Sequence, residues 1–343
     1  MKHKNPTSKY SVRFLVLSLF IISTFITLSA QSADAQKLPE TKISYPTIQP
    51  AGFFQQHFTV DNNKDNPANF SIHRARLGVK GAFSEKIKYN FIIGAVEPPN
   101  RTPALVNGFV DIEFHPSFNL RTGQFLVPFG LEGPEPIFLN PAIERAFPSR
   151  KMNTYRMFRD IGIKVFGRYA LVDYSLSVLN GNGVNVTENI DAKDVVLRLN
   201  FNLSDHFLAG LSGQIGKYET DSFDIFSRQR FGAHFEYKDV NSKNRYRGEF
   251  IYLDKQTERN TNEILMGGYL LYGYQFSGKF ESIGRLEYYQ PNNHDNNYYG
   301  LTLGGNYFLT GKTRLSLNLI GYSETENFND LQYVLNFQLQ YIL

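Results

Sequence analysis

Basic residues recur at alternate positions in several segments of this 343-residue chain, with apolar residues between them. A guanidinium group can donate two parallel hydrogen bonds to a carboxylate or phosphate, so a row of such groups can attract and pass anions. Candidates for such an anion path come from these segments and from one basic connection. They are Arg74, Arg76, Lys80, Arg145, Arg150, Lys151, Arg156, Arg159, Lys164, Arg168, Arg230 and Arg247.

Other kinds of chemistry find little support in the residue types. The chain has no Cys, which excludes disulfides, thiolate metal sites and Cys nucleophiles. The six histidines from His57 to His294 show neither HExxH nor a paired spacing, and no G-x-S-x-G segment is present. Asp61, Asn63 and Asp65 open like a calcium loop, but Ile72 stands where that loop needs Glu. The sequence therefore predicts no metal site, no cofactor and no enzyme activity.

The elements that would position the basic residues are indicated by alternation of apolar and polar residues from residue 51 onward. In the last segment Leu335, Phe337 and Leu339 share one face, while Asn336 and Gln338 share the other. This period of two is typical of β-strands with one apolar and one aqueous side. We expect sixteen strands, or alternatively fourteen, near 51–60, 69–81, 86–96, 105–114, 118–127, 159–169, 172–180, 193–203, 207–217, 228–238, 244–254, 263–276, 279–290, 297–309, 312–322 and 331–343.

Short and long connections alternate between these predicted strands. Tight turns such as Ser277-Gly278 follow even-numbered strands, and longer polar connections such as 181–192 follow odd-numbered ones. An outer-membrane barrel has short periplasmic turns and long external loops. The mean hydropathy of −0.33 leaves no room for a bundle of apolar helices. We therefore predict an all-β transmembrane antiparallel β-barrel over 51–343, with a soluble β-sandwich as the alternative.

The N-terminal residues predict export. Four basic residues within 1–13 precede an apolar stretch at 14–28, and Ala33-Asp34-Ala35 fits a signal-peptidase site. We predict a signal peptide over 1–35 and a short periplasmic segment over 36–50; a membrane anchor is the alternative, although the apolar stretch is short for a span of about 20 residues. Removing 1–35 lowers the formal charge from +4 to +1, so net basicity does not indicate nucleic acid as a partner.

The polar faces of the predicted strands carry sixteen basic and ten acidic residues. Charges can face the interior of a barrel where it holds water or where the charges pair. Sixteen strands make a barrel wide enough for an aqueous channel. These residues therefore predict a water-filled lumen with a modest preference for anions.

One connection, 128–158, is much longer than the others. It is too long for a hairpin and too rich in Pro and apolar residues to extend into solvent. We expect it to fold into the lumen and to line a constriction with its basic residues. The alternative is an external loop whose arginines pair with nearby carboxylates. The basic residues concerned are Arg145, Arg150, Lys151 and Arg156, with Arg159 at the next strand.

Several short motifs in the first half of the chain, roughly 50 to 170, resemble the phosphate-selective porin O and P family. The resemblance implies a sixteen-stranded trimeric outer-membrane porin whose third external loop folds into the lumen and whose basic residues form an anion path. The third long connection here is 128–158, and Arg145 and Arg159 stand at motif positions. The matching segments are His73-Arg74-Ala75-Arg76-Leu77-Gly78-Val79-Lys80-Gly81, Gly123-Gln124-Phe125, Pro128-Phe129-Gly130, Glu144-Arg145 and Arg159-Asp160-Ile161-Gly162.

These features lead us to expect a passive diffusion channel in the outer membrane of a Gram-negative bacterium. Its solutes would be small and hydrophilic, with anions such as phosphate preferred. Its partners would be outer-membrane lipid, the outer-membrane assembly machinery and further copies of the chain in a homotrimer, with no nucleic acid. A non-selective or plugged barrel acting as scaffold or specific uptake route is one alternative, and a membrane-embedded hydrolase is another.

Overall fold

A computed structural model describes residues 44–65, 67–97, 103–186, 192–219, 225–239, 241, 243–257, 261–291, 297–324 and 330–343. The predicted signal peptide, 1–35, lies outside these described residues. No helix among them is long and apolar enough to cross a membrane.

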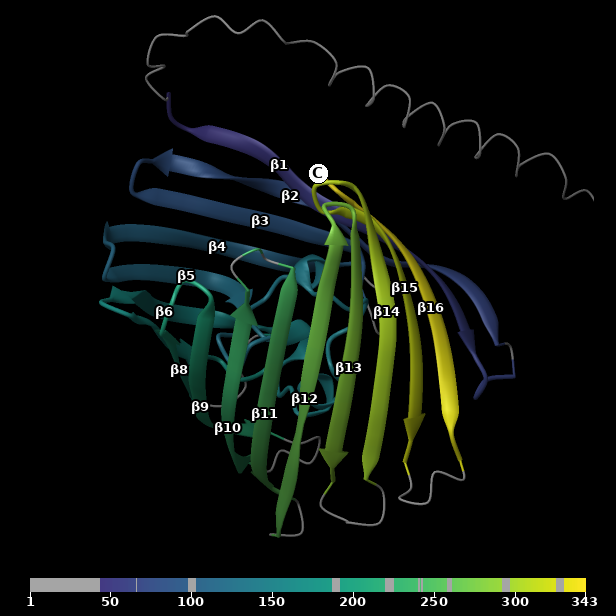
Figure 1. The fold of residues 1–343 in the computed structure, drawn as a ribbon. Coiled ribbons are helices and arrows are strands. Elements are labelled where there is room, and N and C mark those ends of the chain that lie inside the picture. Colours follow the sequence, from purple (N-terminus) through teal and green to yellow (C-terminus); the bar gives the residue numbers. More distant parts are fainter. Residues whose placement is uncertain are drawn as a thin grey trace, which may run out of the picture. The chain divides into compact units, whose positions relative to one another are not determined.

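The described residues form a closed antiparallel barrel in which each strand pairs with its neighbours in sequence and β16 closes on β1 (Figure 1). This confirms the predicted all-β class and strand count. The strands are β1 (Thr47–Asp61), β2 (Ala68–Ser84), β3 (Ile87–Val96), β4 (Ala104–His115), β5 (Phe118–Leu126), β6 (Arg159–Tyr169), β7 (Val172–Leu179), β8 (Asp194–Asn202), β9 (Phe207–Glu219), β10 (Ile225–Lys238), β11 (Asn244–Gln256), β12 (Asn262–Ser277), β13 (Phe280–Gln290), β14 (Tyr298–Thr310), β15 (Thr313–Ser323) and β16 (Gln332–Ile342).

Alternation along each strand separates an apolar outer face from a polar inner face. In β16, Tyr333 and Phe337 are 53% and 40% exposed, while Gln338 and Gln340 are fully buried. The inner glutamines pair across the barrel seam, where Gln55 Nε2 of β1 donates to Gln340 Oε1 at 2.7 Å. A buried amide without a partner would cost free energy, so this cross-strand bond stabilises the seam.

Several strand ends differ from the predicted ones. The first strand begins at Thr47, so the last residues of the predicted segment 36–50 are paired in the sheet. Strands β9 to β12 extend beyond the predicted limits. The two connections predicted to be long, 220–224 and 257–261, are therefore no longer than the predicted tight turn between them, 239–243. The predicted contrast between short and long connections is therefore absent in this part of the barrel.

A β-bulge in β2 changes which side chains face inward. Gln55 pairs with Arg74 and the next residue, Gln56, pairs with Ile72, so His73 is the unpaired extra residue. Bulges re-aim side chains locally. His73 therefore joins Arg74 on the inner face, although strict alternation would place it outward.

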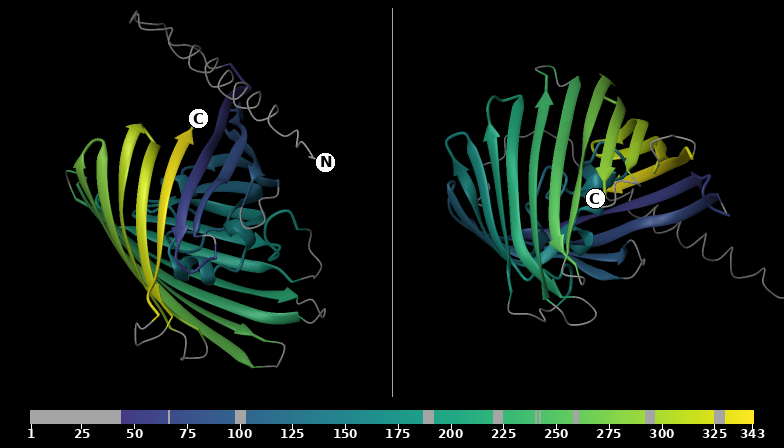
Figure 2. Two further views of the ribbon diagram at one scale, coloured as in Figure 1. Left: turned by 90° about the vertical axis from the view of Figure 1, so that its right-hand side faces the viewer. Right: turned by 90° about the horizontal axis from the view of Figure 1, so that it is seen from below.

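The connection 127–158 contains three short helical segments, η1 (Ile137–Leu139), α2 (Phe147–Lys151) and η2 (Arg156–Phe158). The backbone N–H of Phe147 at the start of α2 donates to Glu287 Oε1 at 2.7 Å, which satisfies a donor that a helix start leaves free. α2 packs against β12 and β13. In Figure 2 the teal helical segments of the connection are seen among the strands of the barrel. The connection thus contacts the inner faces of strands far from it in sequence.

Candidate functional site

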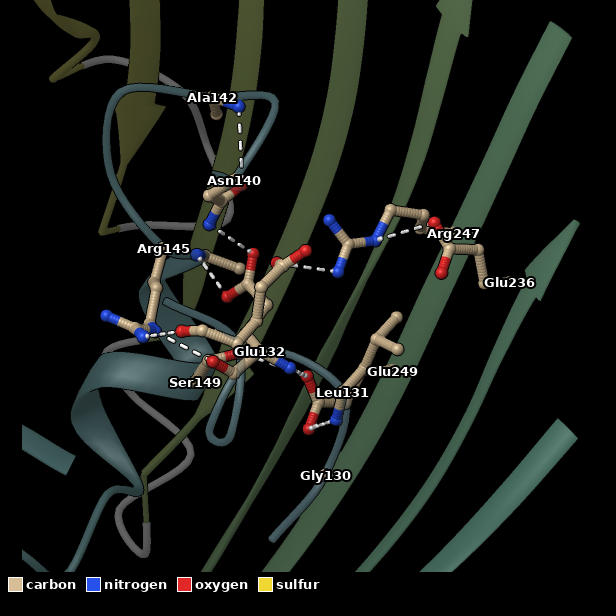
Figure 3. A network of polar contacts seen from close by, with 12 residues as sticks. Gly130, Leu131, Glu132, Asn140, Ala142, Arg145, Ser149, Glu236, Arg247 and Glu249 are labelled. Atoms are coloured by element: carbon tan, nitrogen blue, oxygen red, sulfur yellow. Dashed lines mark hydrogen bonds and ion pairs between the residues drawn. The ribbon is translucent and has the colours of Figure 1, made fainter. Parts of the chain in front are cut away.

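Two buried carboxylates bind the backbone of the connection 127–158 (Figure 3). Glu249 of β11 accepts from the N–H groups of Leu131 and Glu132 at 3.1 and 3.4 Å. The Glu132 carboxylate accepts from Asn140 Nδ2 at 3.1 Å and from the N–H of Ala146 at 2.8 Å. Both Glu side chains are almost completely buried, so these bonds replace lost water contacts and define the path of the chain.

Inward arginines of the barrel wall, Arg198, Arg230, Arg285 and Arg314 among them, donate to backbone carbonyls of the same connection. Each such contact satisfies a carbonyl that would otherwise lack a partner in this irregular segment. The bonds run from Arg198 to Gly130 at 2.7 Å, from Arg230 to Met152 at 2.8 Å, from Arg285 to Glu144 at 2.9 Å and from Arg314 to Asn140 at 2.5 Å.

A small apolar cluster lies under the connection. Phe125 of β5 is fully buried and packs with Phe129, Met152 and Tyr155. Each such side chain contributes about 1.5–3 kcal/mol when it leaves water. The cluster explains why Phe125 faces inward, as do strand residues such as Leu179 and Ile251 in the same cluster.

A cavity of about 1190 Å³ lies between this connection and the inner faces of β1, β2 and β16. Its lining includes six basic side chains and three carboxylates, together with two histidines. The basic residues are Lys64, Arg74, Arg76, Arg145, Arg150 and Arg159, the acidic ones Asp61, Glu97 and Glu144, and the histidines His57 and His73.

Two of the arginines pair with carboxylates in the cavity wall. Arg76 donates to both oxygens of Glu97, at 2.5 and 2.7 Å. Arg74 Nη2 lies 3.2 Å from Glu144 Oε2. Burial raises the pKa of Glu144, but the charge of Arg74 and the contact with His73 outweigh it, so the pKa is held well below its usual range. Glu144 is therefore ionised at neutral pH.

Arg145 and Arg159 donate to neutral oxygens. Arg145 donates to the carbonyls of Glu132 and Glu135, at 2.9 and 2.5 Å, and Arg159 to Asn107 Oδ1 and the carbonyl of Met157, at 3.0 and 2.9 Å. Burial lowers the pKa of Arg145 to about 10, so it still carries its charge at pH 7. The cavity therefore keeps positive charge that no contacting carboxylate in the described residues offsets.

Five of the twelve predicted site residues line this cavity, namely Arg74, Arg76, Arg145, Arg150 and Arg159. Arg230 and Arg247 instead hold the connection: Arg230 as above, and Arg247 through Glu135 at 2.8 Å.

The remaining five lie outside the cavity lining. Lys151 and Arg156 are exposed on the connection, and Lys80 is exposed on β2. Lys164 lies over the rings of Phe125 and Phe166, and Arg168 pairs with Asp173 on β7.

Sequence reasoning missed the cavity residues His57, His73 and Glu97. His57 lies on the polar parity of β1 and could have been found from alternation. His73 required the bulge in β2, and Glu97 required the pairing of β2 with β3, which brings it to Arg76.

A closed sixteen-stranded antiparallel barrel with an apolar exterior, and with a charged connection against its inner wall, defines the class of outer-membrane porins. Solved structures agree in fold. OmpT of Vibrio cholerae with loop L8 deleted has a TM-score of 0.68 at 10% identity, covering 87% of this chain and 100% of that chain. The anion-selective porin from Comamonas acidovorans has a TM-score of 0.65 at 12% identity, covering 87% and 99%. The outer membrane channel DcaP of Acinetobacter baumannii has a TM-score of 0.64 at 10% identity, covering 86% and 97%.

The family model for phosphate-selective porin O and P matches residues 47–245. The chain belongs to this family. An uncharacterized protein of Aquifex aeolicus (strain VF5) is 26% identical over 140 residues, which cover 38% of this chain and 31% of that protein. The match thus spans about a third of the length of the Aquifex protein. Family and fold together support a channel in the outer membrane rather than an enzyme.

Proposed function

We propose that this porin is a passive diffusion channel for small hydrophilic solutes with a modest preference for anions, phosphate among them. The observation that carries the proposal is the cavity lining, in which six basic side chains meet only three carboxylates. The anion-selective Comamonas porin, similar in fold, supports the same reading. The proposal includes export by the segment 1–35, insertion through the outer-membrane assembly machinery into outer-membrane lipid, and a homotrimer.

The mechanism is electrostatic. The connection 127–158 narrows the lumen and presents Arg145, Arg150 and Arg159 to the water-filled cavity. These guanidinium groups replace part of the hydration of an entering anion. The same positive charges repel cations. No covalent step is involved, so weak binding lets the anion leave. Arg230 and Arg247 act by holding the connection in place.

The test compares two neighbouring cations on α2. Arg150 lines the cavity, whereas the exposed Lys151 does not. A unit charge about 8 Å from the ion path in water contributes about 0.5 kcal/mol, so Arg150→Gln should lower the anion-to-cation permeability ratio roughly two-fold. Lys151→Gln should leave it unchanged. The measurement is the reversal potential of purified protein in planar bilayers under a KCl gradient.

A cation-selective wild-type channel, or equal effects of Arg150→Gln and Lys151→Gln, would contradict the anion preference. A plugged barrel would show no single-channel steps at all. An esterase assay on the same preparation tests the hydrolase alternative, which needs activity above that of an empty detergent control.

A further inference from the structure

Two histidines and one carboxylate meet on the wall of the basic cavity. His57 of β1, His73 of β2 and Glu144 of the connection 127–158 each offer a ligand atom, and these atoms lie within 4.8 Å of one another. The His73 Nε2 atom is 2.7 Å from Glu144 Oε1. The two imidazole rings are stacked, with centroids 4.0 Å apart and planes 9° from parallel.

We propose that His57, His73 and Glu144 form a binding site for a divalent transition-metal ion such as Zn²⁺. Two imidazoles and one carboxylate are the protein ligands of open, tetrahedral zinc sites, in which water or an anion takes the fourth position. Ligand atoms in such a site lie roughly 3.4 Å apart. His73 Nε2 and Glu144 Oε1, which are 2.7 Å apart, would have to move apart, and ligand atoms separated by distances nearer 4.8 Å would have to approach one another.

The surroundings of His57 resemble the outer shell of a metal site. His57 is 4% exposed, and its Nε2 lies 2.7 Å from Oε1 of the fully buried Gln338. A hydrogen bond at one ring nitrogen orients the imidazole and leaves the other nitrogen as the ligand atom. The bulge in β2 adds to this arrangement, because it turns His73 inward beside His57.

The three residues lie among basic side chains of the cavity, so a metal ion would bind there together with an anion that offsets their charge. Arg74 contacts both oxygens of the Glu144 carboxylate, with Nη2 3.2 Å from Oε2 and both Nη atoms 3.4 Å from Oε1, and Oε1 also faces His73. The open coordination position would face the arginine-lined cavity, where an anion can complete the site.

The experiment titrates EDTA-stripped, detergent-purified full-length protein with Zn²⁺ alone by isothermal calorimetry. We expect one Zn²⁺ per chain in the wild type. His57→Gln, His73→Gln and Glu144→Gln should each weaken binding about ten-fold or more. The matched control is His115→Gln, which removes an exposed histidine at the end of β4 and should not change binding. Heat-modified electrophoretic mobility checks that each variant folds.

Replacing Zn²⁺ by Co²⁺ supplies a second readout, because visible d–d bands of a four-coordinate nitrogen and oxygen site should appear in the wild type and in His115→Gln only. Equal Zn²⁺ binding by the wild type and a folded His57→Gln/His73→Gln double variant would overturn the proposal. Zinc binding and anion selectivity are separable, since reversal potentials are measured in EDTA.

Discussion

At the scale of single residues, the ion pairs of the barrel wall differ widely in burial. Arg76 and Glu97 form a bidentate ion pair whose side chains are 7% and 2% exposed. Lys88 and Glu113 form a single contact at 2.6 Å with side chains 52% and 39% exposed. Water screens the second pair and not the first, so the two differ in what their loss costs.

Replacing Glu97 by Gln leaves the buried Arg76 charge without its partner. We expect Glu97→Gln to lower the free energy of unfolding by about 3 kcal/mol. The control, Glu113→Gln, should lower it by less than about 1 kcal/mol. Urea unfolding in lipid vesicles, followed by tyrosine fluorescence, measures both. Equal losses would show that Arg76 is solvated rather than paired.

At the scale of elements, the connection 127–158 behaves as an extra layer packed against the barrel wall. Carboxylates of the wall bind its N–H groups, and arginines of the wall bind its carbonyls. An irregular segment has no ladder of its own, so the wall supplies the partners that its backbone needs. This support keeps Arg145 and Arg150 in one position.

Glu249 is the wall residue to test. In Glu249→Gln an amide N–H₂ group replaces one of the two oxygens that accept from the N–H groups of Leu131 and Glu132. The loss of one such buried hydrogen bond destabilises the packed position of the connection by about 1–3 kcal/mol. We expect larger open-channel current noise in single-channel records, because the connection becomes mobile. Glu263→Gln on β12, whose partner is Lys255, should keep the wild-type noise. Unchanged noise in Glu249→Gln would mean that the other contacts suffice.

At the scale of the whole molecule, successive connections lie in turn at one end of the barrel and at the other. The turn at Gly278 and the connection after β1 lie at opposite strand ends. The family orientation would place the first in the periplasm and the second outside the cell. Because the chain has no Cys, single introduced cysteines report this orientation without background.

We expect Asp65→Cys to react with a 5-kDa polyethylene-glycol maleimide on intact cells. Gly278→Cys, where a side chain meets open space, should react only after the outer membrane is permeabilised. The reagent is too large to pass through a pore of this strand number, so on intact cells it reacts only with cysteines at the outer surface. Reaction of Gly278→Cys on intact cells would reverse the proposed orientation.

Much of the fold could be predicted because the period-two pattern is local. The last strand was expected at 331–343 and is found at Gln332–Ile342. Each strand needs one apolar and one polar face, and nearby residues alone reveal this. Where the pattern failed, a distant contact was the cause: Phe125 faces inward because the connection 127–158 packs on it.

The sequence by itself predicted sixteen strands, with fourteen as the alternative, and the two faces of the sheet. Only the tertiary structure decided which charges meet. Arg74 and Glu144 are 70 residues apart and Arg314 and Asn140 are 174 apart, so their contacts depend on closure of the barrel around the connection. His57 and His73 came together through a bulge that breaks the alternation. Local patterns carry no information on such contacts, because these form only when distant segments pack.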